Sequence, residues 1–129
     1  MDNVVLEPDL RPIYPFYPDI GPFFVFVMKK EEILAEKVRA ILTRKGVKAR
    51  DIYDIYFLTE RLKTELQPDL IEKKLSYYDL AFKKQDLSDR ISNVTKKEWN
   101  SELSNIMRSV PDYPKTIHKV LRLIDELKI

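Results

Sequence analysis

Charged residues interrupt the apolar faces of two predicted helices that lie close together in the sequence, between residues 31 and 62. Lys37 falls inside the apolar stripe of the first helix, and Arg44 lies two turns further along the same line. An unpaired charge is costly to bury, so cations facing a core need anionic partners. At about 100° per residue, the stripe contains four aliphatic residues: Ile33, Leu34, Val38 and Ile41.

The second helix offers two carboxylates to those cations. Asp51 is in line with its apolar stripe, and Asp54 lies on the border of the stripe, one turn along. Gly46 provides a natural stop for the first helix, and two antiparallel helices joined by a short turn pack face to face. The sequence therefore predicts that Lys37 and Arg44 meet Asp51 and Asp54 across the interface. The stripe of the second helix contains three residues: Ile55, Leu58 and Leu62.

Two interpretations of this charged cluster remain open. In the first, Lys37 and Arg44 lay their stems along apolar surface and hold their charged ends in water. Asp51 is then a first-turn acid that the helix dipole favours. In the second, the cluster is kept for chemistry or for binding an anionic ligand, because perturbed charges gather at functional sites.

Composition excludes several classes of site. The 129 residues fit one domain with a sizeable core, and a net charge of +2 gives no bulk attraction for nucleic acid. The sequence has no cysteine and one histidine, His118, which excludes disulfides, cysteine-based metal sites and multi-histidine metal sites. No apolar run approaches the roughly 20 residues of a membrane span, and the N-terminus lacks a basic signal region. We expect a cytoplasmic protein.

The first 28 residues differ in composition from the remaining 101. Five of the eight prolines lie there, and they disfavour helices and central strands. We predict short strands at Val4–Leu6 and Phe23–Val27. The expected fold is therefore mainly α, at most α+β. A five- to six-helix bundle over residues 29–129 follows a Pro-rich strand or hairpin segment over residues 1–28, within a single domain.

Helix signals divide the second part of the chain. Asp86 is predicted to cap a short fourth helix, and Thr95–Glu98 has the pattern of a capping box. The predicted helices cover about 30–45, 49–64, 68–83, a short segment from 86, 95–110 and 114–128. The third helix is expected to bury Ile71, Leu75, Tyr78 and Phe82, the fifth Trp99, Leu103, Ile106, Met107 and Val110, and the last Ile117, Val120, Leu121, Ile124 and Leu127.

Three segments of the two-helix stretch resemble motifs of the AbiEii/AbiGii toxin family, whose members are nucleotidyltransferase-like. The segments are EEILAEK at Glu31–Lys37, RAILTR at Arg39–Arg44 and RDIYDIYFL at Arg50–Leu58. The similarity is densest over these thirty or so residues and weaker in the Pro-rich lead-in and the helical tail. The resemblance implies a nucleotidyltransferase-type fold and a toxin of an abortive-infection toxin–antitoxin pair.

The resemblance also implies residue roles. Lys37 would face the triphosphate, and Asp51 and Asp54 would be the essential acidic residues. These three are the expected catalytic residues. Arg44 and Arg50 would contact phosphate or orient the acids. Nucleoside triphosphate and magnesium are implied for the complete enzyme.

In that family the metal-binding carboxylates follow a Gly-Ser or Gly-Gly-Thr loop. Neither Gly21 nor Gly46 precedes an acidic pair in that context. The resemblance thus implies that this chain corresponds to the C-terminal helical half of such an enzyme, with no metal ligands or cofactor of its own. Alone it is expected to be inactive. The implied partners are an N-terminal half or partner chain, an antitoxin and an RNA acceptor, with no membrane.

A non-catalytic function is the alternative. The missing carboxylates and the strand at Phe23–Val27 also fit a helical module that binds a partner or self-associates through its N-terminal strand.

Overall fold

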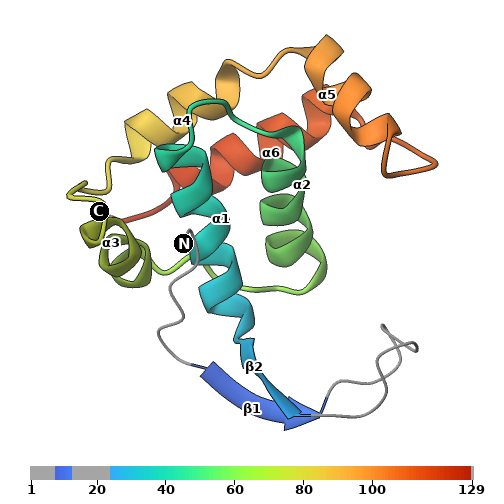
Figure 1. The fold of residues 1–129 in the computed structure, drawn as a ribbon. Helices are drawn as coiled ribbons and strands as arrows, with labels where there is room; N and C mark the ends of the chain where they lie inside the picture. The colour runs from blue at the N-terminus through green and yellow to red at the C-terminus, as the bar shows by residue number, and fades with distance from the viewer. Residues whose placement is uncertain (1–7, 13–23, 129) are drawn as a thin grey trace.

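The structure is a computed structural model that describes residues 8–12 and 24–128. Two strands, β1 and β2, pair antiparallel and lead directly into the first of six α-helices (Figure 1). The mainly helical fold that the sequence predicts is therefore confirmed for the described residues. The predicted strand Val4–Leu6 lies outside them. The elements are β1 (Pro8–Pro12), β2 (Phe24–Met28), α1 (Lys30–Thr43), α2 (Ala49–Tyr56), the π-helix η1 (Phe57–Arg61), α3 (Pro68–Ser76), α4 (Lys84–Ser92), α5 (Lys96–Ser104) and α6 (Tyr113–Asp125).

Helix α1 packs on α2, α3 and α4, and helix α6 packs on α2, α4 and α5 (Figure 1). Trp99 of α5 is fully buried, and its indole N–H donates a 2.9 Å hydrogen bond to the carbonyl of Pro111. The ring of Tyr113 meets the Trp99 ring edge-on at 5.9 Å. Apolar residues from all six α-helices and η1 share one core. None of the described helices is both long enough and apolar enough to cross a membrane.

The predicted capping box is present at the start of α5. The Thr95 hydroxyl accepts the N–H of Glu98 at 3.1 Å, and the Glu98 carboxylate accepts the N–H of Thr95 at 3.0 Å. Helix α6 carries the second side-chain cap, from Asp112 to the N–H of Lys115 at 3.1 Å. Both helices thus begin where a polar side chain satisfies a backbone donor that has no partner within the helix.

The predicted helix ends are only partly correct. Helix α1 ends at Thr43, close to its predicted end, because Arg44 is extended with φ −78° and ψ 151°. The backbone of Gly46 does not adopt the left-handed conformation that a C-terminal glycine stop requires. Helix α5 stops at Ser104, before Pro111, so Ile106 is exposed instead of facing the core. Each helix end lies where the chain turns to meet a neighbouring helix, which periodicity alone does not reveal.

The second and third helices also end early. A π-turn closes the second helix, with the N–H of Leu62 donating to the carbonyl of Phe57 at 3.2 Å, so Leu62 rotates out of the core. Helix α3 ends at Ser76, and Tyr78 follows it outside the helix. Asp86 lies in the first turn of α4, whose N-cap residue is Lys83. Phe82 is buried as predicted, but from the loop before α4.

A cation–carboxylate cluster between α1 and α2 as the candidate site

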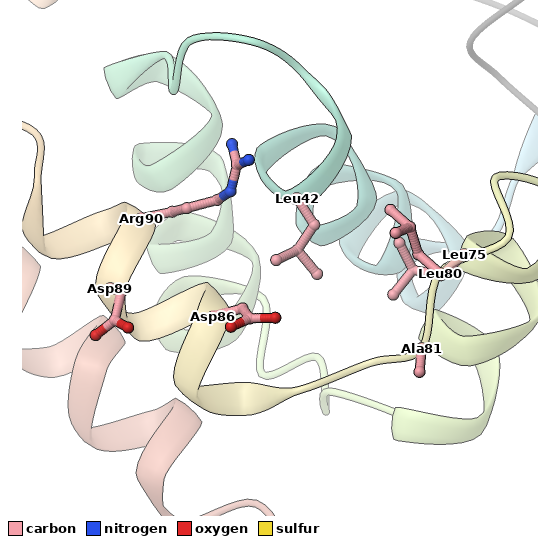
Figure 2. A pocket seen from close by; sticks show the side chains of 7 residues that line it. All are labelled: Leu42, Leu75, Leu80, Ala81, Asp86, Asp89 and Arg90. Carbon is pink, nitrogen blue, oxygen red and sulfur yellow. The ribbon is translucent and has the colours of Figure 1, made fainter.

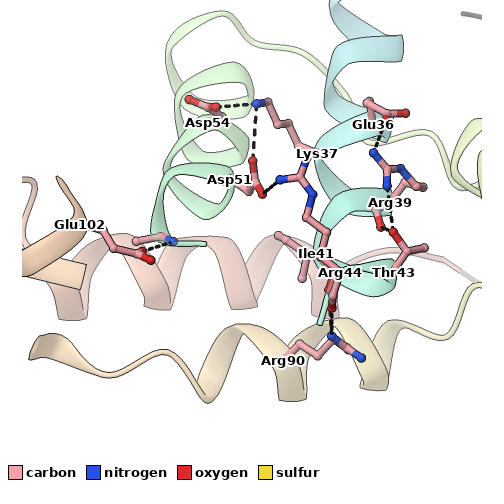
Figure 3. A network of polar contacts seen from close by, with 11 residues as sticks. Glu36, Lys37, Arg39, Ile41, Thr43, Arg44, Asp51, Asp54, Arg90 and Glu102 are labelled. Atoms are coloured by element: carbon pink, nitrogen blue, oxygen red, sulfur yellow. Dashed lines mark hydrogen bonds and ion pairs between the residues drawn. The ribbon is translucent and has the colours of Figure 1, made fainter. Parts of the chain in front are cut away.

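Two side chains from other helices fix the turn between α1 and α2 (Figure 3). Arg90 of α4 donates hydrogen bonds to the carbonyls of Ile41 and Arg44, at 3.2 and 3.0 Å, at the C-terminus of α1. Glu102 of α5 accepts the N–H of Ala49 at 2.6 Å, at the N-terminus of α2. Each charge matches the sign that the helix dipole favours at that end. The two helices are therefore anchored where their sequences supply no side-chain cap of their own.

Four charged residues meet between the anchored helices. The Lys37 ammonium lies 2.8 Å from the Asp54 carboxylate and 3.5 Å from that of Asp51. The Arg44 guanidinium donates to the other oxygen of Asp51 at 3.2 Å. The cross-helix contact that the sequence predicts is thus present in the structure (Figure 3).

Burial differs sharply within this cluster. The Asp51 side chain is 3% exposed, while those of Lys37, Arg44 and Asp54 are 27%, 35% and 31% exposed. The two cations compensate the buried carboxylate, which is the condition for keeping a charge out of water. The cations reach water, as the first interpretation requires, and they also converge on one buried acid. The second interpretation, that the cluster serves chemistry or the binding of an anionic ligand, stays a prediction.

A pocket of about 230 Å³ lies beside the cluster, and Lys37, Arg44 and Asp51 are among its lining residues. Sites for whole drug-sized ligands occupy roughly 300–1,000 Å³. This pocket is therefore large enough for part of a nucleotide, such as its phosphates, but not for all of it. Two cations with exposed surface at its rim favour an anionic group there.

Arg50 is the predicted site residue that the structure leaves outside the cluster. It is exposed in the first turn of α2, and the described part of the chain gives it no ion pair. Arg50 lies four residues before Asp54, so the two share one side of α2. It adds a third cation to the same surface, with no ion pair to the other four residues in the described part of the chain.

A second charged cluster, between α1 and α3, was missed by the sequence analysis. Lys74 of α3 lies 3.1 Å from Glu36 and 3.2 Å from Glu32 of α1, and Glu36 also pairs with Arg39. The Arg39 guanidinium lies over the ring of Tyr78, 5.3 Å from its centroid. All four charged residues of this network are buried. Glu32, Glu36 and Arg39 follow helical spacing on one face, and that signal would have found three of the four.

The described carboxylates do not form a site that fits magnesium. Residues 8–12 and 24–128 contain no group of three or more potential metal ligands. Asp51 and Asp54, the carboxylates of the cluster, already face cations. The metal that the family resemblance implies therefore finds no ligand set among these residues.

Another pocket, of about 350 Å³, opens between the end of α1, the loop after α3, and α4 (Figure 2). Asp86 and Asp89 place two carboxylates at this pocket, beside apolar side chains. Its cation, Arg90, already donates to the carbonyls at the end of α1. The pocket at Lys37 also has two carboxylates, but it has three cations where this one has Arg90 alone, so this pocket suits an anionic ligand less well. The lining residues are Leu42, Leu75, Leu80, Ala81, Asp86, Asp89 and Arg90.

Comparison with known proteins identifies the family. The model of the nucleotidyl transferase AbiEii toxin, type IV toxin–antitoxin system, matches residues 1–125. No curated protein and no solved structure matched the chain. The family match spans nearly all of the chain, including the two helices whose motifs carry the resemblance. The chain therefore belongs to the AbiEii family of nucleotidyl transferase toxins of type IV toxin–antitoxin systems.

Proposed function

We propose that the α1–α2 surface binds the phosphates of a nucleoside triphosphate, and that the chain works as the C-terminal helical half of a nucleotidyltransferase toxin. The observation that carries the proposal is the convergence of Lys37 and Arg44 on buried Asp51 at the rim of a phosphate-sized pocket. Membership of the AbiEii family supports the same reaction class.

Lys37 and Arg44 suit different parts of this task. The Lys37 ammonium is a compact charge with three donors, and both of its carboxylate contacts lie on the α2 side. The Arg44 guanidinium uses one terminal nitrogen for Asp51, and its other N–H groups face no partner among the described residues. Each cation therefore keeps donors for phosphate oxygens while Asp51 holds it in position.

Charge placement connects this binding to nucleotidyl transfer. The oxygen of an acceptor hydroxyl bonds to the α-phosphorus and gives up its proton to water, while the bond from the α-phosphorus to the bridging oxygen of the β-phosphate breaks and pyrophosphate leaves with the electron pair. Cations held beside the β- and γ-phosphates stabilise the charge that develops on that leaving group. Lys37 and Arg44 take this role in our proposal, and Asp51 and Asp54 orient them. Arg50 adds a phosphate contact from α2.

In our proposal, groups outside the described residues hold the magnesium and supply the acceptor hydroxyl. Magnesium would offset the triphosphate charge, and we propose that an N-terminal half or a partner chain holds it with carboxylates. An RNA or a protein supplies the acceptor hydroxyl. Because the family's systems pair a toxin with an antitoxin, an antitoxin that counters this activity is the expected functional partner.

The first experiment measures nucleotide binding by the thermal unfolding midpoint of the protein with ATP or GTP and magnesium. A ligand at 100 times its Kd stabilises the native state by about 2.7 kcal/mol. We expect Lys37→Ala to abolish most of that gain. Lys119→Ala is the matched control, because Lys119 also pairs with a carboxylate, that of Glu60 at 3.8 Å, but belongs to α6 and is not part of the ion cluster. Equal nucleotide responses of the two variants would contradict the proposal.

The second experiment measures transfer from a labelled nucleotide after the chain is combined with a segment that carries the metal carboxylates. The Lys37→Ala and Asp54→Ala variants should each label acceptors far less than the unmutated complex. If they label acceptors equally well, the roles assigned to these residues are wrong.

A second candidate function rests on the small sheet. It has two strands in the described part of the chain, so each strand has one edge without a partner there. Such an edge favours a non-catalytic module that binds a partner or a second copy by strand addition. Light scattering distinguishes the two candidates: a strict monomer that responds to nucleotide supports the first, and a dimer with no nucleotide response supports the second.

A further inference from the structure

An aromatic surface continues from the candidate phosphate site along α2. Phe57, which begins η1, is 38% exposed, and Tyr53 is partly exposed one turn before it. Their ring centroids lie 6.3 Å apart with the planes tilted by 34°. The Phe57 ring thus leans back toward the N-terminal end of α2, where the ion cluster lies, as helical side chains generally do.

Helical spacing places Phe57 on the same side of α2 as Asp54 of the cluster. Asp54 and Phe57 are three residues apart, which puts their Cβ atoms about 5–6 Å from each other. Arg50 shares this side of α2 with both. Asp54 in turn contacts Lys37 at 2.8 Å. Asp54 and Lys37 therefore connect Phe57 to the phosphate pocket across α1 and α2, which lie side by side (Figure 1).

A π-turn begins at Phe57, which lies on the surface. Thr59 donates its hydroxyl to the carbonyls of Ile55 and Tyr56, at 2.8 and 3.2 Å, where the helix widens. Leu58 is buried in the core while its neighbour Phe57 faces outward. Single π-turns inside helices occur frequently at functional sites.

We propose that Phe57, backed by Tyr53, is the stacking surface for the base of the nucleotide whose phosphates contact Lys37 and Arg44. The inference rests on the proposed function. The pocket at Lys37 is too small for a whole nucleotide, so the base lies on neighbouring surface. Phe57 is an exposed aromatic ring next to the cluster. The positive charge of Arg50 beside it complements the negative charge of the phosphates. Aromatic rings accept any base, because every base has a π face.

The test compares a ligand that has a base with one that has none. Isothermal titration measures the Kd of ATP and of inorganic tripolyphosphate, each with magnesium. Because the loss of one base–aromatic stack typically weakens binding by about 5- to 150-fold, Phe57→Ala should lower ATP affinity within that range. It should leave tripolyphosphate affinity unchanged. Tyr77→Ala is the matched control, because Tyr77 is 62% exposed at the end of α3, away from this surface, and should change neither Kd.

A second variant gives a direct optical readout and keeps an aromatic ring at the position. Phe57→Trp introduces an exposed indole, whereas the native Trp99 is fully buried. ATP should quench the new fluorescence, and tripolyphosphate should not. If ATP binds without quenching and Phe57→Ala binds it normally, the inference is overturned and the phosphate site stands. If neither ligand binds the unmutated protein, both the inference and the proposed function fail.

Discussion

Asp51 and Asp54 share one lysine, Lys37, but only Asp51 is buried against it. Asp51 also accepts a hydrogen bond from Arg44, whereas Asp54 has the Lys37 ammonium as its single ion-pair partner among the described residues. The two carboxylates, one helical turn apart, therefore contribute unequally to the stability of the structure. The buried one holds two cations in place, and the more exposed one is available to change partners when a ligand arrives.

This inequality predicts unequal effects on stability. Asp51→Asn should lower the free energy of unfolding by about 1–3 kcal/mol, because a buried charged acceptor is lost. Asp54→Asn should cost less than about 1 kcal/mol, as for exposed ion pairs. Urea unfolding of the two variants and the unmutated chain measures the difference. Equal costs would mean that burial does not govern this cluster.

The buried network between α1 and α3 predicts a larger loss. Lys74→Ala should lower the free energy of unfolding by about 3–5 kcal/mol, because it removes the cation from two buried carboxylates, Glu32 and Glu36. Lys73→Ala is the matched control. Lys73 is the exposed neighbour on the same helix, and its loss should stay within about 0.5 kcal/mol. Denaturant midpoints of both variants check this, and similar midpoints would contradict the structural role of Lys74.

Arg90 should stabilise the turn that carries the candidate site. Arg90→Ala removes two hydrogen bonds from a charged donor to the end of α1, with an expected cost of about 1–3 kcal/mol. Arg122→Ala serves as the control, because Arg122 is highly exposed and pairs with Glu126 on the same helix. Thermal unfolding of the two variants should show a lower midpoint for Arg90→Ala alone. Equal midpoints would show that the turn does not depend on Arg90.

The capping box predicts a pH-dependent contribution to stability. Hydrogen bonds from the backbone N–H and then the hydroxyl of Thr95 hold the pKa of Glu98 below its usual range. A lowered pKa in the folded state means that the stabilisation is present above the unfolded-state pKa and is lost as pH falls through the folded-state pKa.

Glu98→Gln removes this titration and keeps a residue that can complete a capping box. The difference in unfolding free energy between the unmutated chain and this variant should shrink as the solution becomes acidic. NMR titration of the Glu98 carboxylate gives the pKa directly. A pKa at or above that of an ordinary glutamate would contradict the hydrogen-bonding account.

The contacts of the ion cluster could be predicted from the sequence, because its four residues lie close together in the chain. Lys37 lies on α1 and Arg44 directly follows its last residue, and a five-residue connection that begins with Arg44 forces α2 to return antiparallel beside α1. Once two amphipathic helices are paired this way, the residues on their stripes must meet. The same reasoning correctly identified Trp99 and the capping box at Thr95, which depend on periodicity and on one four-residue motif.

Contacts between distant segments could not be predicted in the same way. In the sequence, Lys74 is one of two adjacent lysines and has the pattern of a surface residue. Only the packing of α3 on α1 buries it beside Glu32, which lies 42 positions earlier in the chain. Leu62 was expected in the core, but the π-turn adds a residue to the helical register and rotates it into solvent. Arg50 matched a family motif, yet its side chain is exposed on α2 while that of the next residue, Asp51, is buried in the cluster.

The most direct test of the central claim locates the nucleotide on the protein. Backbone amide shifts of ¹⁵N-labelled protein are followed while ATP and magnesium are added. The account predicts that the largest shifts centre on Lys37, Arg44, Arg50 and Phe57, and that Lys37→Ala suppresses them. Shifts centred on the pocket at Leu80 and Asp89, or no shifts at millimolar ATP, would contradict the assignment of the α1–α2 surface as a nucleotide site.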